Sequence, residues 1–372
     1  MKNTFSGVLL VIGLILIMPL QKLVAQKQLI NDSLNVHNTF TEKIKVSGVF
    51  YLAANYDKAP DAEHYAFLVR RAYLTVMADL TKNLSVRYTQ DITIDMEGND
   101  AGNVELRIKY AYMQYKFSDF LFFTNNHIRF GITQRPWFDY EEHINAYRVS
   151  GTMFFERSGL FNSSGFGLSY EGFFGGKLTS EYTKRINAHY PGKYGTFSIG
   201  VFNGGGYHNF EKNTNKTFEA RISIRPMPSL LPGLQFTYMG IYGKENIPES
   251  ADFIFNAGYV SYESKLLTVT AQYETGLGNS TGVYVDSNFN ALPHHGYSVY
   301  GEFRIPKTAL ALYGRYDNFI LQAEETIYSK RYITGASWRF FKQNKIVLTY
   351  QKGTVFNKPD TQMVDLALDI SF

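Results

Sequence analysis

The feature that most constrains this chain is a two-residue alternation of apolar and polar side chains, which recurs from about residue 43 to residue 372. The clearest case is the last segment, whose alternate positions are apolar at Val364, Leu366, Leu368, Ile370 and Phe372. The positions between them are Asp365, Ala367, Asp369 and Ser371. Successive side chains of a β-strand point to opposite faces of a sheet. The alternation therefore predicts strands with one apolar face and one polar face.

The same alternation, interrupted by turns, predicts sixteen strands. We expect them near residues 43–56, 65–80, 84–95, 103–117, 126–135, 163–173, 193–203, 216–225, 233–243, 252–263, 265–275, 295–305, 308–318, 327–340, 345–355 and 362–372. An even number is typical of a single-chain bacterial β-barrel with both ends on the periplasmic side. That parity puts the short turns on the periplasmic side and the longer segments 136–162, 204–215 and 276–294 outside.

The segment between residues 175 and 191 leaves an alternative open, because it is long for a periplasmic turn. Its stretch Thr179 to Ala188 fits a short helix with Ser180 as the N-cap. The same stretch also fits two further strands, which would raise the number from sixteen to eighteen. We favour the helix and sixteen strands.

The first 25 residues predict a secretory signal peptide. Lys2 is followed by an apolar run from residue 8 to residue 20 and by Leu23-Val24-Ala25, the charged, apolar and small-residue order of such signals. A membrane anchor is the alternative, but Pro19 interrupts the run and a spanning helix needs about 20 residues. We expect cleavage near Ala25, a short lead-in over 26–42, too short for a plug domain, and a barrel over 43–372.

The expected fold class is all-β, a membrane-spanning antiparallel β-barrel. The hydrophobic fraction of 45% does not oppose this, since lipid-facing residues of a barrel alternate with polar ones. A soluble β-sandwich would also show alternation. Sixteen amphipathic strands, an export signal, 28 Tyr and 30 Phe, and a terminal phenylalanine together favour the membrane barrel.

Several functional classes find little support. The net charge of +4 is too small to indicate nucleic-acid binding, and the absence of cysteine excludes disulfides and thiolate chemistry. His294 and His295 are adjacent, so in a strand they would point apart, and no ligand spacing suggests a metal or another cofactor. No nucleophile and base are singled out, so we do not expect an enzyme.

A sixteen-stranded barrel leaves an aqueous channel, whose lining charges bias the ions that pass. The polar faces of the strands and the mouth of the longest loop carry a series of basic residues, namely Arg71, Arg87, Arg107, Lys109, Arg129, Arg135, Arg221, Arg304 and Arg315. Acidic residues share these faces at Asp79, Asp91, Glu219, Glu302 and Asp317. The pattern predicts passive diffusion of small hydrophilic solutes with a preference for anions such as phosphate. A non-selective porin is the alternative, and whether Arg70 or Arg71 faces the channel stays open.

The longest expected outer loop is rich in aromatic residues. It contains Trp137, Phe138, Tyr140, Tyr147, Phe154 and Phe155. So many aromatic side chains are unfavourable in open solvent. We therefore expect the loop to fold into the barrel and narrow the channel, with a contact between subunits as the competing interpretation.

Over nearly all of its expected mature length the chain resembles the phosphate-selective porin O and P family. The resemblance rests on Arg70-Arg71-Ala72-Tyr73-Leu74, on the run from Ile128 to Pro136, on Gly200 to Gly204, on Glu219 to Pro226 and on Tyr313 to Asp317. It implies a homotrimeric outer-membrane porin of a Gram-negative bacterium with sixteen strands and an inward-folded third loop. Phosphate selectivity in the family depends on an arginine ladder and a lysine cluster. Here the loop carries Glu141, Glu142, Arg148, Glu156 and Arg157 in place of such a cluster.

The expected partners follow from this resemblance and from the strand pattern. They are small anions or other hydrophilic solutes, outer-membrane lipid and further copies of the chain. Phe372, with Leu368 and Ile370, also resembles the C-terminal signal read by the barrel assembly machinery. No nucleic-acid partner is expected.

Overall fold

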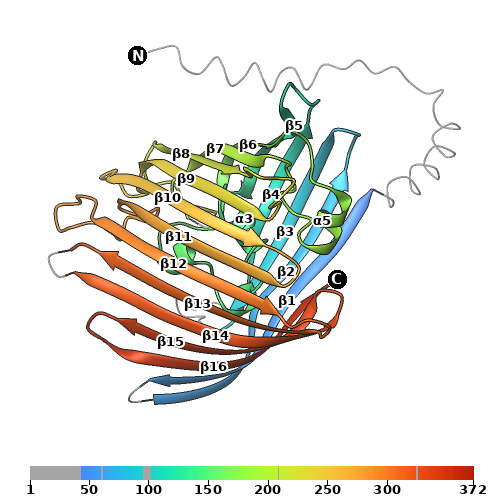
Figure 1. Cartoon of the computed structure of the whole chain (residues 1–372). Coiled ribbons are helices and arrows are strands. Elements are labelled where there is room, and N and C mark those ends of the chain that lie inside the picture. Colours follow the sequence, from blue (N-terminus) through green and yellow to red (C-terminus); the bar gives the residue numbers. More distant parts are fainter. Residues whose placement is uncertain (1–42, 60–61, 95–101, 208, 324–325) are drawn as a thin grey trace, which may run out of the picture. The chain divides into compact units, whose positions relative to one another are not determined.

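A computed structural model describes residues 43–59, 62–94, 102–207, 209–323 and 326–372. Sixteen strands form a closed barrel in which neighbours along the chain pair with each other and β1 pairs with β16 (Figure 1). The expected antiparallel barrel and its strand number are thus confirmed. The predicted signal peptide over 1–25 and the lead-in over 26–42 lie outside the described residues.

The strand bounds agree closely with the alternation. The strands are β1 Ile44–Ala59, β2 Ala62–Asp79, β3 Leu84–Ile94, β4 Val104–Lys116, β5 Phe123–Gln134, β6 Ser164–Phe174, β7 Gly195–Asn203, β8 Lys216–Ile224, β9 Leu234–Lys244, β10 Asp252–Glu263, β11 Leu267–Leu277, β12 Pro293–Arg304, β13 Leu310–Leu321, β14 Ile327–Phe341, β15 Asn344–Val355 and β16 Lys358–Ser371. The largest difference is at β16, which begins at residue 358 rather than 362.

The disputed segment contains a helix, α5 (Ser180–Arg185), so the eighteen-strand alternative is wrong. Its N-cap is Thr179, one residue before the expected Ser180. The Thr179 hydroxyl accepts a hydrogen bond from the backbone N–H of Tyr182 at 3.4 Å. This bond satisfies one of the N–H groups that a helix leaves free at its start.

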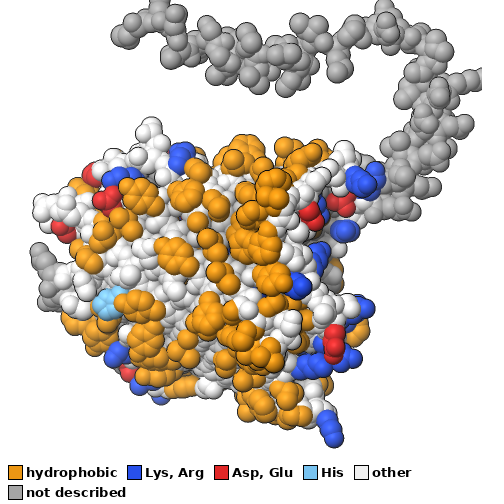
Figure 2. All heavy atoms as spheres, turned by 45° about the horizontal axis from the view of Figure 1, so that its top comes forward, with side chains coloured by type: hydrophobic (Ala, Val, Ile, Leu, Met, Phe, Trp, Pro, Cys, Tyr) orange, Lys and Arg blue, Asp and Glu red, His pale blue; other side chains and the backbone are white. Residues whose placement is uncertain are grey.

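The alternation separates the two faces of the barrel wall. On β8, Phe218, Ile222 and Ile224 are exposed on the outside, whereas Glu219 and Arg221 are fully buried on the inside. Hydrophobic side chains cover much of the exterior face seen in Figure 2, and charged side chains lie mostly toward its edges. An apolar exterior on a closed barrel is what a lipid bilayer requires, because no strand edge is left unpaired. Among the described residues, no helix is long and apolar enough to cross a membrane.

The barrel has two rims that differ in their connections. We call the rim that carries Ile44 and Ser371 the terminal rim, and the opposite one the far rim. At the terminal rim the connections cover 80–83, 117–122, 225–233, 264–266, 305–309 and 342–343, together with the longer 175–194. The longest connection, residues 135–163 between β5 and β6, begins and ends at the far rim.

Phe372 seals the junction between β1 and β16. The backbones of Gly48 and Phe372 exchange two hydrogen bonds of 3.1 Å. The Phe372 ring stacks on Phe50 with 5.8 Å between the ring centroids, and it covers Gly48 so closely that a Cβ there would lie 2.4 Å from the ring. Glycine at position 48 thus makes room for the terminal ring.

We predict that Phe372→Ala lowers the free energy of unfolding by about 1 kcal/mol, because the aromatic pair with Phe50 is lost. Gly48→Ala should also destabilise, since its methyl group displaces the ring. In the Phe372→Ala background, however, Gly48→Ala should cost much less. Denaturant unfolding of the two single variants and the double variant in lipid vesicles measures this coupling. Additive effects would show that the ring does not pack on Gly48.

Candidate functional site

The connection 135–163, here called the interior loop, holds three short helical turns. They are α3 (Phe138–Glu142), η1 (Arg148–Ser150) and α4 (Phe154–Arg157). The loop begins beside β5, yet its hydrogen bonds reach inward-facing side chains of strands as distant as β13 and β15. Only a segment inside the barrel can bond to that part of the inner wall. In Figure 1, α3 is likewise seen between the strands of the wall.

Aromatic packing fixes the loop to β10 on both sides of its tip. The Trp137 ring lies 5.3 Å from the ring of Tyr259, and the Phe155 ring lies 4.8 Å from that of Phe255. All four side chains are fully or almost fully buried. The same cluster includes inward positions of β9, β10 and β13, at Met239, Ile241, Phe253, Ala257, Phe319 and Leu321. These strands are therefore apolar on both faces where the loop covers them.

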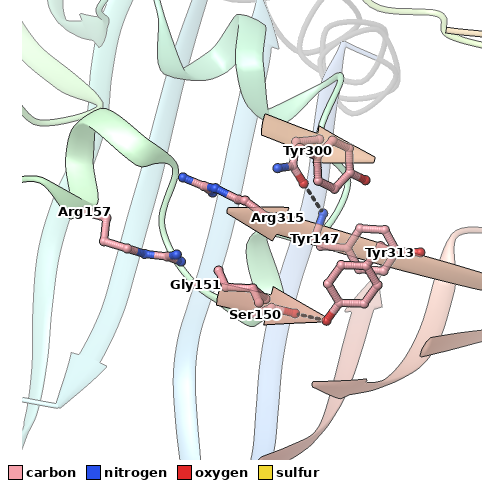
Figure 3. Close-up of a pocket in the computed structure, with 9 residues that line it drawn as sticks. Tyr147, Ser150, Gly151, Arg157, Tyr300, Tyr313 and Arg315 are labelled. Atoms are coloured by element: carbon pink, nitrogen blue, oxygen red, sulfur yellow. Dashed lines mark hydrogen bonds between the residues drawn. The ribbon is translucent and has the colours of Figure 1, made fainter. Parts of the chain in front are cut away.

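Hydrogen bonds fix the tip of the loop to β12–β15. The Tyr147 hydroxyl lies 3.0 Å from Glu302 and 2.8 Å from Ser337, and its ring stacks on Tyr313 with 3.7 Å between centroids. Ser150 bonds to the Tyr313 hydroxyl at 2.7 Å (Figure 3). A cavity of about 10 Å³ remains beside these residues, room for about one water molecule. The tip is therefore closely packed and not a swinging segment.

Several charged side chains of the interior loop are neutralised in ion pairs. The guanidinium group of Arg135 pairs with Glu219 of β8, and both side chains are fully buried. Arg148 pairs with Glu142 at 2.8 Å and with Glu156 at 2.9 Å. Paired charges of this kind hold the loop together but offer little net attraction to a passing ion.

The nine basic residues expected along the channel have different surroundings. Arg135 and Arg221 are fully buried at the base of the loop, where Arg221 donates to the Pro136 carbonyl at 2.7 Å. Other basic residues have a carboxylate within 4 Å, in the pairs Arg107–Asp91, Arg129–Glu171, Arg304–Glu302 and Arg315–Asp317. Within the described part of the chain, Arg71, Arg87 and Lys109 have no such partner.

Arg71, Arg87 and Lys109 instead contact tyrosines on neighbouring strands β2–β4. The Lys109 ammonium lies 4.2 Å from the centre of the Tyr73 ring, and the Arg87 guanidinium lies 4.6 Å from that of Tyr110. Both Arg71 and Lys109 donate to the Tyr73 hydroxyl at 3.1 Å. Contacts between cations and rings orient a charge without cancelling it. We call Arg71, Arg87 and Lys109 the cation row.

A β-bulge on β4 brings the side chains of Lys109 and Tyr110 to the same face of the barrel wall. Thr89 of β3 pairs with Tyr110, whereas its neighbour Gln90 pairs with Ile108, so Lys109 is an extra residue in the ladder. Lys109 and Tyr110 are consequently both buried on the inner side although they are adjacent in sequence. Bulges commonly re-aim side chains in this way.

Acidic groups of the interior loop lie opposite the cation row. The pKa of Asp139 is held below its ordinary range, although burial alone would raise it, because His143, the Tyr190 hydroxyl, Arg129 and Arg87 stabilise its charge. Burial alone would also raise the pKa of Glu156, but the positive charges of Arg148, Arg71 and Lys109 outweigh burial and lower it. The interior loop and the β2–β5 wall thus interact electrostatically across the inside of the barrel.

Both members of the Arg70-Arg71 pair reach interior groups. Arg71 bonds to Tyr73, as described, whereas Arg70 pairs with the buried carboxylate of Asp365 on β16. Asn55 of β1 donates to the same carboxylate at 2.8 Å. The open question about this pair therefore has no single answer, because Arg70 closes the seam near β1 and Arg71 belongs to the cation row.

Among the described residues, no group of three or more His, Asp or Glu side chains is arranged to hold a metal ion. His294 is fully buried against Glu274, with 2.9 Å between its Nδ1 and the carboxylate. This pair closes β11 against β12 and is not open to a solute.

We predict that Arg135→Met lowers the free energy of unfolding by about 3–5 kcal/mol, since it leaves the buried Glu219 carboxylate without its cation. The double variant Arg135→Met/Glu219→Leu should recover most of that loss, because no buried charge then remains unpaired. Unfolding in denaturant, followed by tryptophan fluorescence, measures both changes. If the double variant is as unstable as the single variant, the loss of stability comes from lost packing and not from the unpaired Glu219 carboxylate.

Comparisons with known proteins place the fold but not a family. No family model and no curated protein matches the chain. Among solved structures it resembles the anion-selective porin from Comamonas acidovorans, with a TM-score of 0.61 and 11% identity over 88% of this chain and 99% of that one. It also resembles OmpF of Salmonella typhi, in a complex with daunomycin, with a TM-score of 0.57 and 11% identity over 88% and 97%. The outer membrane channel DcaP of Acinetobacter baumannii gives 0.53 and 12% identity over 88% and 97%. The chain therefore has the fold of outer-membrane porins.

Proposed function

We propose that the chain is a passive channel of the outer membrane for small hydrophilic solutes, with a preference for anions. One observation carries the anion preference. Arg71, Arg87 and Lys109 form a row on adjacent strands and have no carboxylate within 4 Å among the described residues. The interior loop packs against β8–β16 and β1. It leaves Arg71 of β2 and Arg87 of β3 partly exposed, whereas Lys109 of β4 is buried.

The row suits conduction better than tight binding. A site that conducts must attract the ion and then release it, which several moderate sites do better than one strong pocket. Tyrosine contacts hold the three cations in defined positions. Two of them are guanidinium groups, whose parallel donors match the oxygens of phosphate and carboxylate.

We include phosphate among the permeant anions. The resemblance to the phosphate-selective porin family and the two unneutralised arginines support this extension. The interior loop has acidic residues where that family has lysines, which favours transient contact with phosphate over strong retention. By the same resemblance we propose a homotrimer, and OmpT of Vibrio cholerae, a structure of similar fold, is described in a trimer form. Recognition of Phe372 by the barrel assembly machinery belongs to the same proposal.

A non-selective porin is the second candidate. The acidic Asp139 and Glu156 interact with the cation row across the interior, and equal opposing charges would cancel an anion preference. An outer-membrane enzyme is less favoured, since the described residues show no hydroxyl nucleophile bonded to a histidine. Assays on phospholipid and peptide substrates with purified protein would reveal such an activity.

We predict that Arg71→Gln/Arg87→Gln/Lys109→Gln abolishes or inverts the anion preference. The measurement is the reversal potential in planar bilayers under a salt gradient, because it reports the ratio of anion to cation permeability. A matched control removes three exposed lysines from terminal-rim turns, Lys82→Gln/Lys307→Gln/Lys342→Gln, and should keep the preference. A preference for cations, or no conductance at all, in the natural chain would refute the proposal of an anion-preferring channel. Failure of millimolar phosphate to reduce chloride current would remove phosphate from it.

We predict that the charges of Asp139 and Glu156 affect the selectivity equally at pH 7 and at pH 5. Asp139 and Glu156 have pKa values lowered by neighbouring cations, so they remain charged in that window. These two carboxylates become neutral only when the pH falls below the range in which carboxylates ordinarily titrate, and the anion preference should then rise. Asp139→Asn/Glu156→Gln should show the higher preference already at pH 7. A marked change between pH 7 and 5 in the natural chain, absent from this variant, would contradict the assignment.

A further inference from the structure

The connection 175–194 between β6 and β7 differs from the other connections at the terminal rim. It is the longest of them, and it contains α5. The exposed face of this helix carries an ion pair between Glu181 and Arg185, whereas Tyr182 is buried with Arg225 lying 5.5 Å from its ring centre. The helix is thus anchored to the rim by one side.

After α5 the chain contacts the interior loop. The Asn187 amide donates to the His143 carbonyl at 2.9 Å and to Glu263 of β10 at 2.7 Å. His143 is the C-cap residue of α3 in the interior loop. Since the interior loop starts at the far rim and the 175–194 connection starts at the terminal rim, two segments from opposite rims meet inside the barrel.

Two ring contacts strengthen this meeting. His189 stacks on His143 with 3.6 Å between ring centroids, and the Tyr190 hydroxyl donates to the Asp139 carboxylate. The Tyr190 ring also lies 5.3 Å from that of Tyr140 of the loop. The surrounding protein and the imidazole of His143 both lower the pKa of His189, which favours its neutral form in the stack.

The inner edge of the connection borders open space. A cavity of about 310 Å³ lies between Ala188, His189 and Tyr190 on one side and the inner wall of β4–β6 on the other. Ala188 and His189 are exposed, although their neighbours Asn187 and Tyr190 are fixed by hydrogen bonds. A segment that only braced the loop would bury this edge against protein. Here the edge instead forms one wall of a water-accessible space.

That space is also bordered by charged groups of the ion path. Arg129, Asp139, Glu171 and Lys116 line it. Asp139 is the residue that interacts with Arg87 of the cation row. In the channel proposed above, solutes that leave the cation row toward the terminal rim pass this edge.

We propose that residues 187–190 form a second constriction, which limits solute size on the terminal-rim side of the interior loop. The proposal rests on the channel function proposed above and adds to it a determinant of size. The contacts of Asn187, His189 and Tyr190 fix the position of this constriction relative to α3. Charge selectivity remains with the cation row, and size selection is shared between the two inward segments.

The test compares two variants of the same connection by single-channel conductance and by exclusion of neutral sugars and polyethylene glycols. Asn187→Ala/His189→Ala/Tyr190→Ala should raise the conductance by about 1.5-fold or more and admit larger neutral solutes, since pore width governs passage. The control Glu181→Ala/Arg185→Ala removes only ion pairs between exposed side chains, Glu181 with Arg185 and with Lys265, and should match the natural chain. Tyr190→Phe, which loses one hydrogen bond, should give a smaller increase.

The outcomes separate this inference from the channel proposal. If the natural chain conducts and the triple variant shows the same conductance and size limit, the second constriction is refuted while the channel stands. If the natural chain does not conduct, the channel proposal itself fails. A folded triple variant with lower conductance would also overturn the inference, because it would mean that the connection only supports the interior loop.

Discussion

The packing of the interior loop on the inner wall is the interaction on which the rest of the structure depends. Phe253, Phe255 and Tyr259 of β10 point inward, where an open channel would expose them to water. Burying one such side chain contributes roughly 1.5–3 kcal/mol. The loop supplies Trp137, Phe155 and other rings that exclude water from this wall. The wall and the loop therefore cannot be stable in their present form without each other, and the loop position is a property of the fold.

This packing also decides which charges remain available. The loop covers the wall from β8 through β16 to β1. Its own Arg135, and Arg221 and Arg315 of that wall, are held in ion pairs or hydrogen bonds. The uncovered wall keeps the cation row. Under the proposed function, solute selectivity depends on the basic residues that this packing leaves free.

The strands could be predicted from the sequence, whereas the surroundings of the candidate site residues could not. A period of two fixes which residues face outward, and every expected strand was found because lipid demands an unbroken apolar exterior. The same period cannot distinguish an inward arginine in water from one buried under a loop, so Arg71 and Arg135 looked alike. The inward Phe253 and Phe255 were the available signal, since apolar residues on both faces of one strand indicate a covered inner wall. The contact of 187–190 with α3 joins segments without any shared pattern, and only the three-dimensional arrangement shows it.

The tyrosines explain how a row of like charges persists without carboxylates. Arg71 and Lys109 share the hydroxyl of Tyr73, and the rings of Tyr73 and Tyr110 face the neighbouring cations. Such contacts are worth about 0.5–1 kcal/mol at partly exposed sites such as Arg87, and more where the cation is desolvated, as at the buried Lys109. A carboxylate in the same place would neutralise the row, and bare lysines would sample many rotamers. Tyrosine therefore keeps both the position and the charge of the row, which is the combination that transient binding of an anion requires.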